Sequence, residues 1–423
     1  MSLRFTPRQW GIVLLIAAVQ LVNILDFVMM MPMGPILATS LHIDESHLGY
    51  LNASYTASAA IAGLVGSVFL DRFDRRKALA VAMGGLVVGT IAGGAAVDLP
   101  TLMLTRVVAG AFGGPATSLA FSIIADSIPA PLRGRAMGTV MGAFSFASVL
   151  GVPAGLWAAE SISWRAPFFF VGGIGFFVVL AAIALLPPMT GHLQSRREQV
   201  GFTVLLSRPI VQISYAMTAT VMLAGFVLIP NIASYITSNL DFPKESLKFA
   251  YMFGGIVSLG ATQLGGRLVD RFSSFKVGAA GTALSVLTVY LFFFQPLHAP
   301  PPRVVYVVFM AFMLANGLRN VAYNTLASKV VEPEVRARFQ SLQSAVQHLS
   351  AAIAALIGTR LLTTLARPPT WPGASSTVLM GMPEVALVCM VLSACVPLLI
   401  LTVESRLTAV GAATVVAPQV AAK

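Results

Sequence analysis

Long apolar runs separated by short polar segments make up most of the chain. Most of these runs reach the roughly 20 residues that a helix needs to cross the hydrocarbon core of a bilayer. They lie at about 10–38, 48–70, 78–97, 101–125, 137–159, 166–187, 210–238, 247–269, 277–296, 303–329, 337–365 and 382–403. We therefore predict an all-α membrane protein with twelve transmembrane helices.

The composition supports this interpretation. Only 10% of the 423 residues are Asp, Glu, Lys or Arg, whereas soluble chains carry about a quarter. With so few charges and a mean hydropathy of +0.84, a chain of this size would not stay in water. The composition excludes a soluble enzyme, a disordered chain and a secreted disulfide scaffold. The two cysteines, Cys389 and Cys395, fall on different faces of one predicted helix, so they cannot pair with each other.

The basic residues predict the orientation in the membrane. Of the 27 Lys and Arg residues, 19 lie at the termini and in alternate loops, five lie in the opposite loops, and three lie within apolar runs. Because Lys and Arg accumulate on the cytoplasmic side, we expect a multi-pass protein of the inner or plasma membrane with both termini in the cytoplasm. The same distribution accounts for the net charge of +11 without nucleic acid, since no basic stripe interleaves with aromatic residues.

The chain divides near its middle. Residues 188–209 form a polar, basic segment, which we interpret as a cytoplasmic linker between six-helix halves at 1–187 and 210–423. An internal repeat supports this division, because the Asp-Arg-Phe at 71–73 recurs at 270–272, which is 199 residues later. The Arg-x-Arg at 133–135 likewise recurs at 336–338, an offset of 203.

The repeated loop resembles a motif of the major facilitator superfamily, Gly-x-Leu-x-Asp-Arg-x-Gly-Arg-Arg/Lys after the second span. Ser67 and Asp74 replace the two glycines of this motif. The matching residues are Asp71, Arg72, Arg75, Arg76 and Lys77 in the first half, with Asp270 and Arg271 in the second. The resemblance implies that this loop latches the two halves together in the outward-facing state.

Three further segments are similar to motifs of the same superfamily. Arg106 and the glycine four residues later resemble its Arg-x-x-x-Gly motif. Gly151, Pro153 and Gly155 resemble the Gly-Pro-rich motif of proton antiporters and would let a helix bend. Residues 163–169 resemble the Trp-Arg-x-x-Phe junction of efflux permeases. The chain therefore resembles the twelve-span drug and sugar efflux branch, which implies two pseudo-symmetric six-helix bundles around a cavity that opens alternately to each side.

One acid lies in the middle of an apolar run. Fifteen of the 16 Asp and Glu residues fall in or beside polar segments, and the remaining one is Asp26 in the first run. A carboxylate at such a depth costs about 2.5–3.5 kcal/mol and usually faces a cavity. We interpret Asp26 as the acid that couples transport to protons or contacts the substrate. The alternative is a carboxylic acid that bonds a neighbouring helix and only holds its register.

Intramembrane arginines are the next candidates. Arg106 would pair with the coupling acid or anchor the substrate, because a guanidinium keeps its charge and needs an anion, a carbonyl or water. The alternative for Arg106 is a structural link to a neighbouring backbone. Arg319 has no counterpart at the repeat offset, which favours a role in lining the cavity. The predicted cavity residues are Asn23, Asp26, Asn231, Tyr235, Arg319, Asn320 and Gln347.

Together these features predict a secondary active transporter that exports a small organic molecule, such as a drug, sugar or metabolite, in exchange for protons. Two alternatives are a uniporter or importer on the same fold, and a membrane receptor or sensor that transports nothing. The sequence has no metal-ligand spacing, nucleophile elbow or phosphate loop, so we expect no metal, no cofactor and no enzymatic activity. We expect a monomer in the lipid bilayer, with the substrate and protons as its partners.

Overall fold

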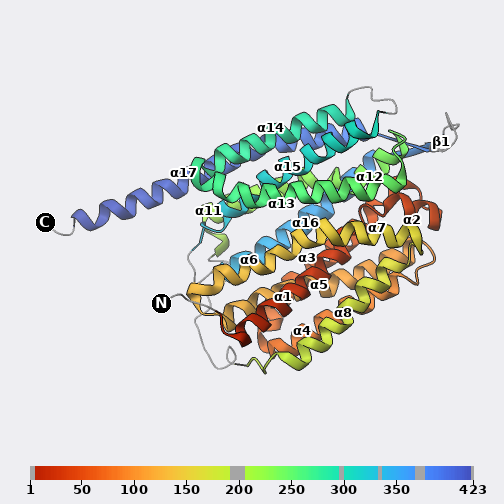
Figure 1. Cartoon of the computed structure of the whole chain (residues 1–423). Coiled ribbons are helices and arrows are strands. Elements are labelled where there is room, and N and C mark those ends of the chain that lie inside the picture. Colours follow the sequence, from red (N-terminus) through yellow and green to blue (C-terminus); the bar gives the residue numbers. More distant parts are fainter. Residues whose placement is uncertain (1–4, 191–204, 295–299, 332–335, 367–376, 421–423) are drawn as a thin grey trace.

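The computed structural model describes residues 5–190, 205–294, 300–331, 336–366 and 377–420, and most of them are helical (Figure 1). The first half of the chain forms α1 (Pro7–Val28), α2 (Gly34–Leu41), α3 (Gly49–Phe69), α4 (Arg75–Gly93), α5 (Leu99–Ser127), α6 (Ala130–Phe146), α7 (Val152–Ser161) and α8 (Ala166–Leu185). Its short turns are η1 (Glu45–His47) and η2 (Leu70–Arg72), and the π-helical segment η3 (Ala147–Gly151) joins α6 to α7.

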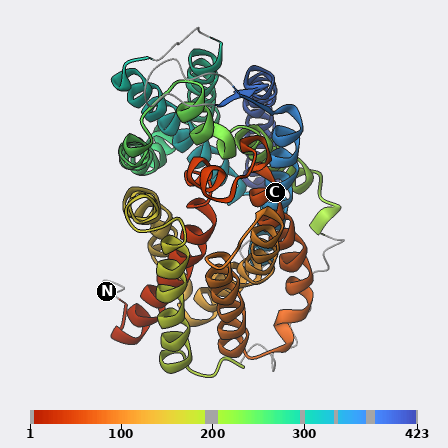
Figure 2. The ribbon, with the colours of Figure 1, turned by 90° about the vertical axis from the view of Figure 1, so that its right-hand side faces the viewer.

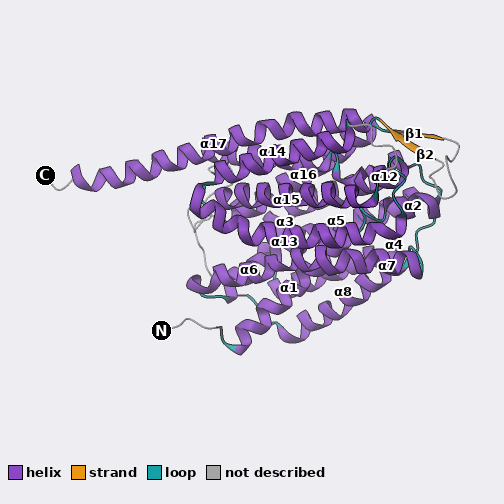
Figure 3. Ribbon diagram, turned by 45° about the horizontal axis from the view of Figure 1, so that its top comes forward, coloured by secondary structure: helices purple, strands orange, loops and turns teal. Residues whose placement is uncertain are grey.

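The second half is built in a similar way. Its helices are α11 (Pro209–Phe226), α12 (Ile229–Ser238), η4 (Lys244–Ser246), α13 (Leu247–Phe272), α14 (Ser274–Phe293), α15 (Pro302–Ala327), α16 (Arg336–Leu361) and α17 (Met382–Val420). A hairpin of β1 (Thr363–Ala366) and β2 (Thr377–Met380) pairs antiparallel, with Thr363 opposite Met380. The hairpin lies at the end of the molecule opposite both termini, which we call the distal end (Figure 3).

The helices follow the predicted apolar runs. Nine helical stretches among the described residues are long and apolar enough to cross a membrane. The other three predicted runs correspond to α3, α13 and α16. The all-α membrane fold is therefore confirmed, and the number of twelve crossings stays a prediction.

Two of the membrane helices are interrupted at corresponding places in the two halves. α1 ends at Val28, Pro32 lies in the turn that follows, and the chain resumes as α2 at Gly34. α11 ends at Phe226, and α12 carries Pro230 in its first turn. Proline cannot donate the backbone hydrogen bond that would continue a helix. Irregular backbone inside a membrane is tolerated only where it is buried in protein or lines a water-filled cavity.

The helices of the two halves gather on opposite sides of the molecule. α1–α8, coloured red to yellow, lie on one side, and most of the green to blue helices lie on the other (Figure 1 and Figure 2). The halves meet where α16 packs along α3 and where α13 packs against η3 and α7. At the distal end, α2 contacts α12.

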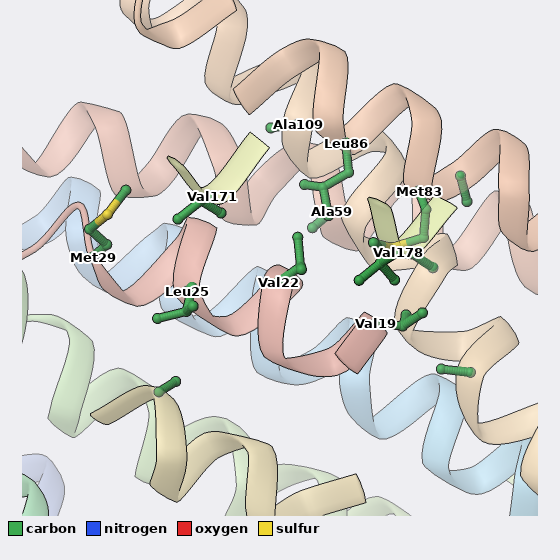
Figure 4. Close-up of a cluster of buried hydrophobic side chains, with 14 of the residues drawn as sticks. Val19, Val22, Leu25, Met29, Ala59, Met83, Leu86, Ala109, Val171 and Val178 are labelled. Carbon is green, nitrogen blue, oxygen red and sulfur yellow. The ribbon is translucent and has the colours of Figure 1, made fainter. Parts of the chain in front are cut away.

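The helix α1 runs through the core of the first half. Its Val22 and Leu25 are buried in one cluster with Met83 of α4 and Val178 of α8 (Figure 4). Helices in a bilayer are held together by such van der Waals packing, since lipid tails are as apolar as the side chains. Large apolar side chains on the outside, such as Phe177 at 70% exposed, are compatible with contact to lipid. The packing of α1 fixes the position of the polar residues that it carries.

Candidate functional site

A buried ion pair joins α1 to α5. Nη1 of Arg106 donates a hydrogen bond to Oδ1 of Asp26 at 2.9 Å, and the exposed fractions of the two side chains are 1% and 0%. Nη2 of Arg106 donates to the carbonyl oxygen of Gly89 at 3.4 Å. The ring of Phe168 lies 5.4 Å from the guanidinium carbon, within the range of cation–π attraction. The acid and the arginine that the sequence singled out separately are thus in direct contact.

Thr90 of α4 also hydrogen-bonds to the carboxylate of Asp26. Its hydroxyl lies 2.7 Å from Oδ1 of Asp26 and 2.8 Å from the carbonyl oxygen of Leu86. A hydroxyl has one proton to donate, and the bond to a charged acceptor is the stronger of the two. The sequence analysis missed Thr90, because nothing in that apolar run distinguishes it from a threonine that bonds only its own helix.

Two polar atoms of the pair have no hydrogen-bond partner among the described residues: Oδ2 of Asp26 and Nε of Arg106. A buried polar atom that is left unsatisfied costs about 1–3 kcal/mol, and more where it belongs to a charged group. Oδ1 of Asp26 therefore holds the arginine, whereas Oδ2 of the same carboxylate has no donor among the described residues.

Glycines on α4 make room for the arginine. A Cβ at Gly93 would lie 3.1 Å from Nη2 of Arg106 and 2.8 Å from the ring of Phe168. A Cβ at Gly89 would lie 2.6 Å from the backbone nitrogen of Ala109 on α5. Only small residues at these positions let α4 and α5 approach closely enough for the guanidinium to reach the carbonyl oxygen of Gly89.

Asn23 lies one turn before Asp26, and both ends of its amide hydrogen-bond to neighbouring helices. Its amide nitrogen donates to the carbonyl oxygen of Gly113 at 2.7 Å and to the hydroxyl of Thr117 at 3.0 Å. Its amide oxygen accepts the hydroxyl proton of Tyr55 at 2.9 Å. These bonds join α1, α3 and α5, so they hold the helix that carries Asp26 in place.

A second buried arginine, Arg319 on α15, lies within the other half. Its Nη1 donates to the hydroxyl of Ser393 on α17 at 3.1 Å, and its Nη2 donates to the amide oxygen of Asn316 at 2.7 Å. The residue is 2% exposed, and its Nε has no partner in the structure. Both partners are neutral, whereas Arg106 has a carboxylate.

Of the other predicted cavity residues, two are buried and two are partly exposed. Asn231 is fully buried, and neither polar atom of its side chain has a hydrogen-bond partner in the described segments. The hydroxyl of Tyr235 donates to the carbonyl oxygen of Phe292 at 3.0 Å, within the second half. Gln347 is partly exposed and donates to the hydroxyl of Tyr323 at 3.2 Å, and Asn320 is also partly exposed. Among the described residues, the side chain of Asp26 hydrogen-bonds to Thr90 and Arg106 and to none of these four side chains.

Comparison with known proteins identifies the family. The profile of the Major Facilitator Superfamily matches residues 16–355 and, in a second match, 214–414. The chain belongs to this superfamily.

Relatives of known name agree with this assignment. The "Inner membrane transport protein YdhP" of Escherichia coli K12 is 27% identical over 244 residues, which is 57% of this chain and 62% of that protein. The chain thus matches less than two thirds of the length of this relative. The "Quinolone resistance protein NorA" of Staphylococcus aureus is 22% identical over 305 residues, covering 70% of this chain and 77% of that one. A crystal structure of a D-xylose–proton symporter has the same fold, with a TM-score of 0.72, 16% identity, and coverage of 92% and 97%.

The loop that resembles the latch of the superfamily is organised by Asp74, which stands where the motif has a glycine. Oδ1 of Asp74 accepts the backbone N–H of Arg76 at 2.9 Å and that of Met189 at 3.0 Å. It therefore caps α4 and ties the loop to the segment that follows α8. Arg75 forms an ion pair with Asp126 at 3.1 Å, while Arg72 is exposed. The side chain of Asp71 lies outside the described residues.

The second copy of the superfamily loop differs from the first. Asp270 and Arg271 are both exposed, and the guanidinium of Arg271 lies 5.4 Å from the ring centre of Phe272. Here Glu404 of α17 caps α14 by accepting the backbone N–H groups of Ser274 and Phe275 at 3.1 and 3.0 Å. The helix that follows each copy is therefore capped by a different acid, Asp74 in the first half and Glu404 in the second.

The Gly-Pro-rich segment of the superfamily coincides with a change of helix type. The π-helical segment η3 ends at Gly151, and α7 begins with Val152 and Pro153. A Cβ at Gly151 would lie 2.1 Å from a methyl carbon of Leu25, and a Cβ at Gly155 would lie 3.0 Å from the sulfur of Met29. The two glycines thus allow this irregular helix to approach α1 on either side of Asp26.

Polar contacts join the two halves at the distal end. The carboxylate of Glu45 accepts the hydroxyl proton of Ser238, with Oγ 2.8–2.9 Å from its two oxygens. Burial raises the pKa of Glu45 above its usual value of 4.5, against the opposing effects of Ser238 and Lys244. Lys248 of α13 forms an ion pair with Glu160 of α7 at 2.6 Å. These contacts close the distal end in this structure.

A second cross-half contact involves Asp44, the neighbour of Glu45. Its carboxylate accepts hydrogen bonds from the side chain of Thr364 on β1 and from the backbone and side chain of Ser46. Burial acts to raise the pKa of Asp44, but these hydrogen bonds outweigh it and leave the pKa below the usual 3.8. Adjacent acids at the distal end therefore titrate in opposite directions from their usual values.

Proposed function

We propose that the protein is a secondary active transporter that exports a small organic molecule in exchange for protons by alternating access. The observation that supports this best is the buried pair of Asp26 and Arg106 just before the interruption between α1 and α2. Ionisable residues inside membrane bundles usually mark ion or substrate pathways, and transporters build their sites beside broken helices. The names of YdhP and NorA, a transport protein and a resistance protein, point the same way.

Asp26 is the proposed site of the transported proton. While Asp26 is charged, it holds the guanidinium of Arg106 at Oδ1. A proton that binds at Oδ2 neutralises the carboxylate and leaves the charge on Arg106 without a buried counter-ion, which is strongly unfavourable. The protonated pair therefore favours a rearrangement that gives Arg106 another anion or water. Exposure of Asp26 to the two sides in turn would load and release the proton.

The remaining sequence assignments are part of the same proposal. The segments 1–187 and 210–423 are proposed to rock as two bodies joined by residues 188–209, most of which lie outside the described residues. With both termini in the cytoplasm of the inner or plasma membrane, the closed distal end corresponds to a state that faces the cytoplasm. The loop residues Asp71, Arg72, Arg75, Arg76, Asp270 and Arg271 are proposed to stabilise the opposite state. We propose that a monomer carries out the cycle.

The proposed substrate contacts have unequal support. Asn320 and Gln347 are partly exposed and are the best placed to meet a ligand. Asn231 is buried with an unpartnered amide. Asn23 and Tyr235 already bond other helices, so we propose that they position α1 and α12 rather than hold substrate directly.

The first experiment measures coupled flux. A thermal-shift screen of sugars, nucleosides, amino acids and lipophilic drugs on the purified protein selects a ligand. Everted membrane vesicles then establish a pH gradient, reported by acridine orange fluorescence. Adding the ligand should dissipate the gradient in vesicles with the wild-type protein and not in vesicles with Asp26→Asn. The control Asp98→Asn keeps the helix cap of α5 on an exposed residue and should behave as wild type.

The outcome also separates the alternatives. Ligand uptake that does not depend on the gradient and is unchanged in Asp26→Asn would contradict the exchange with protons and indicate a uniporter. Ligand binding without any flux in sealed liposomes would indicate a receptor or sensor on the same fold.

A further inference from the structure

The second half contains a buried positive charge for which the described residues provide no acid. Within the described part of the chain, the guanidinium of Arg319 bonds to Ser393 and Asn316, which are both neutral, and its Nε has no partner there. A buried guanidinium without a counter-ion is costly, because the charge loses its hydration and gains no Coulombic partner in return. Something that binds reversibly can provide this missing charge.

The internal repeat shows where the acid is missing. At the offset of 199 residues that relates the two Asp-Arg-Phe loops, the tripeptide Asp26-Phe-Val of α1 aligns with Gly225-Phe-Val of α11. The two phenylalanines, Phe27 and Phe226, stack on each other across the halves with ring centres 5.9 Å apart, which supports the alignment in space. Gly225 thus occupies the position that Asp26 occupies in the first half.

Arg319 points at this position. A Cβ at Gly225 would lie 3.9 Å from Nη2 of Arg319, so the arginine of the second half faces the glycine as Arg106 faces Asp26. The nearest atom to that Cβ would be Cδ1 of Ile229 at 3.4 Å, an ordinary van der Waals contact. A single carbon added at Gly225 therefore fits next to the guanidinium without displacing the backbone.

Irregular backbone and two amides lie near Arg319. α11 ends one residue after Gly225, and such breaks within a membrane are tolerated where they are buried or line a cavity. Asn316 and Asn320 share one face of α15 at a spacing of four residues, and both are partly exposed. The amide of Asn316 accepts from Arg319 and donates to the carbonyl oxygen of Phe312, so it fixes the guanidinium on this face of α15.

We propose that Arg319 binds an organic monocarboxylate, the anionic group of the transported molecule, in the place that Asp26 fills in the first half. A planar carboxylate fits the donor geometry of a guanidinium. One carboxylate neutralises one guanidinium, whereas a doubly charged phosphate would leave a buried negative charge. This inference rests on the proposed function for the role of the anion as cargo, but the binding site itself does not depend on coupling to protons.

The test uses acetate and its neutral isostere acetamide on the purified protein in detergent at constant ionic strength. Acetate should raise the midpoint of thermal unfolding of the wild-type protein in a saturable way, and acetamide should not. The shift should vanish in Arg319→Gln and be reduced in Arg319→Lys, which keeps the charge and loses the planar fork. An acetate shift that is equal in wild type and Arg319→Gln, or absent from the wild type, would overturn the proposal.

A second pair of variants tests the site without any ligand. Gly225→Asp should supply the missing carboxylate, raise the unfolding midpoint relative to the isosteric Gly225→Asn, and remove the response to acetate. This difference should disappear when Arg319→Gln is added to both variants. Equal midpoints for Gly225→Asp and Gly225→Asn would show that the guanidinium does not face this position and would overturn the proposal.

The test of the carboxylate site is independent of the test of proton exchange, because the acetate shift is measured without a pH gradient. Coupled flux without an acetate shift would remove only the carboxylate site. An acetate shift without coupled flux would remove the exchange with protons and leave the site.

Discussion

The carboxylate of Asp26 and the guanidinium of Arg106 lie 2.9 Å apart, although 80 residues separate them in the chain. Neither side chain is accessible to solvent to more than 1%. A buried pair of this kind is weak support for stability as such, because the two charges lose their hydration. Removing one partner costs more stability than removing both, because it leaves the other charge buried without a counter-ion.

The first prediction compares single and double variants of this ion pair. Asp26→Asn and Arg106→Gln should each lower the free energy of unfolding by about 3–5 kcal/mol, because each leaves one uncompensated charge. The double variant should lose much less than the sum of the two single losses. Denaturant or detergent-induced unfolding of the four proteins measures the coupling. Additive losses would contradict a direct ion pair.

Thr90 gives the second prediction. Thr90→Val keeps the branched shape and removes the hydroxyl that bonds Asp26 at 2.7 Å. We expect the free energy of unfolding to fall by about 1.5–3 kcal/mol, the range for a hydrogen bond to a charged group. Thr90→Ser keeps the hydroxyl and should lose less. If Thr90→Val loses no more than Thr90→Ser, the hydroxyl bond to Asp26 does not contribute to stability.

The sequence could locate Asp26 but not its surroundings. A lone acid within an apolar run is conspicuous, because the energetic cost of burying it requires an explanation. Which helix faces it depends on how closely helices approach, and this closeness is set by glycines such as Gly93 that have no polar signature. Thr90 was missed for the same reason, since a hydroxyl that can bond its own helix gives no sign of a second partner.

Polar side chains within apolar runs are harder to assign from sequence. Asn23 and Tyr235 are predicted to line the cavity, and this stays a prediction; in the structure their polar atoms bond neighbouring helices. A polar group in a membrane helix must face protein or water, and sequence periodicity does not distinguish these two environments. The apolar runs, by contrast, predict most helix ends within a few residues, because length and hydropathy decide where a helix can cross a bilayer. The exceptions are the start of α6 at Ala130 and the end of α17 at Val420, which extend beyond the runs 137–159 and 382–403.

A close approach between the halves gives the third prediction. A Cβ at Gly255 of α13 would lie 2.7 Å from the backbone oxygen of Ser148 in η3. Gly255→Ala should therefore force α13 away from η3 and cost about 1–3 kcal/mol of stability, as overpacking does. Gly260→Ala on the same helix is the control, because a Cβ there meets nothing within 4 Å. Equal unfolding midpoints for the two variants would show that the contact gives way without cost.

Acids at the distal end give the last prediction, a dependence of closure on pH. Because burial raises the pKa of Glu45 in the closed state, the closed state binds its proton more tightly than a state in which Glu45 meets water. Closure is therefore favoured at low pH and weakens as the pH rises from 4.5 through the raised pKa. The lowered pKa of Asp44 acts only below about 3.8, where acid would weaken closure, so the two effects occupy separate ranges.

Spin labels at two cysteines introduced across the distal contact can follow this closure. The pair Glu160→Cys and Lys248→Cys lies on α7 and α13, with Cys389→Ser and Cys395→Ser to remove the native thiols. The distance between the labels should lengthen as the pH rises above 4.5, and Glu45→Gln, which mimics the protonated acid, should abolish this change. Ser238→Ala should weaken closure at every pH, because it removes the donor to Glu45. If the distance between the labels changes with pH equally in the protein with Glu45 and in the Glu45→Gln variant, another group causes the response.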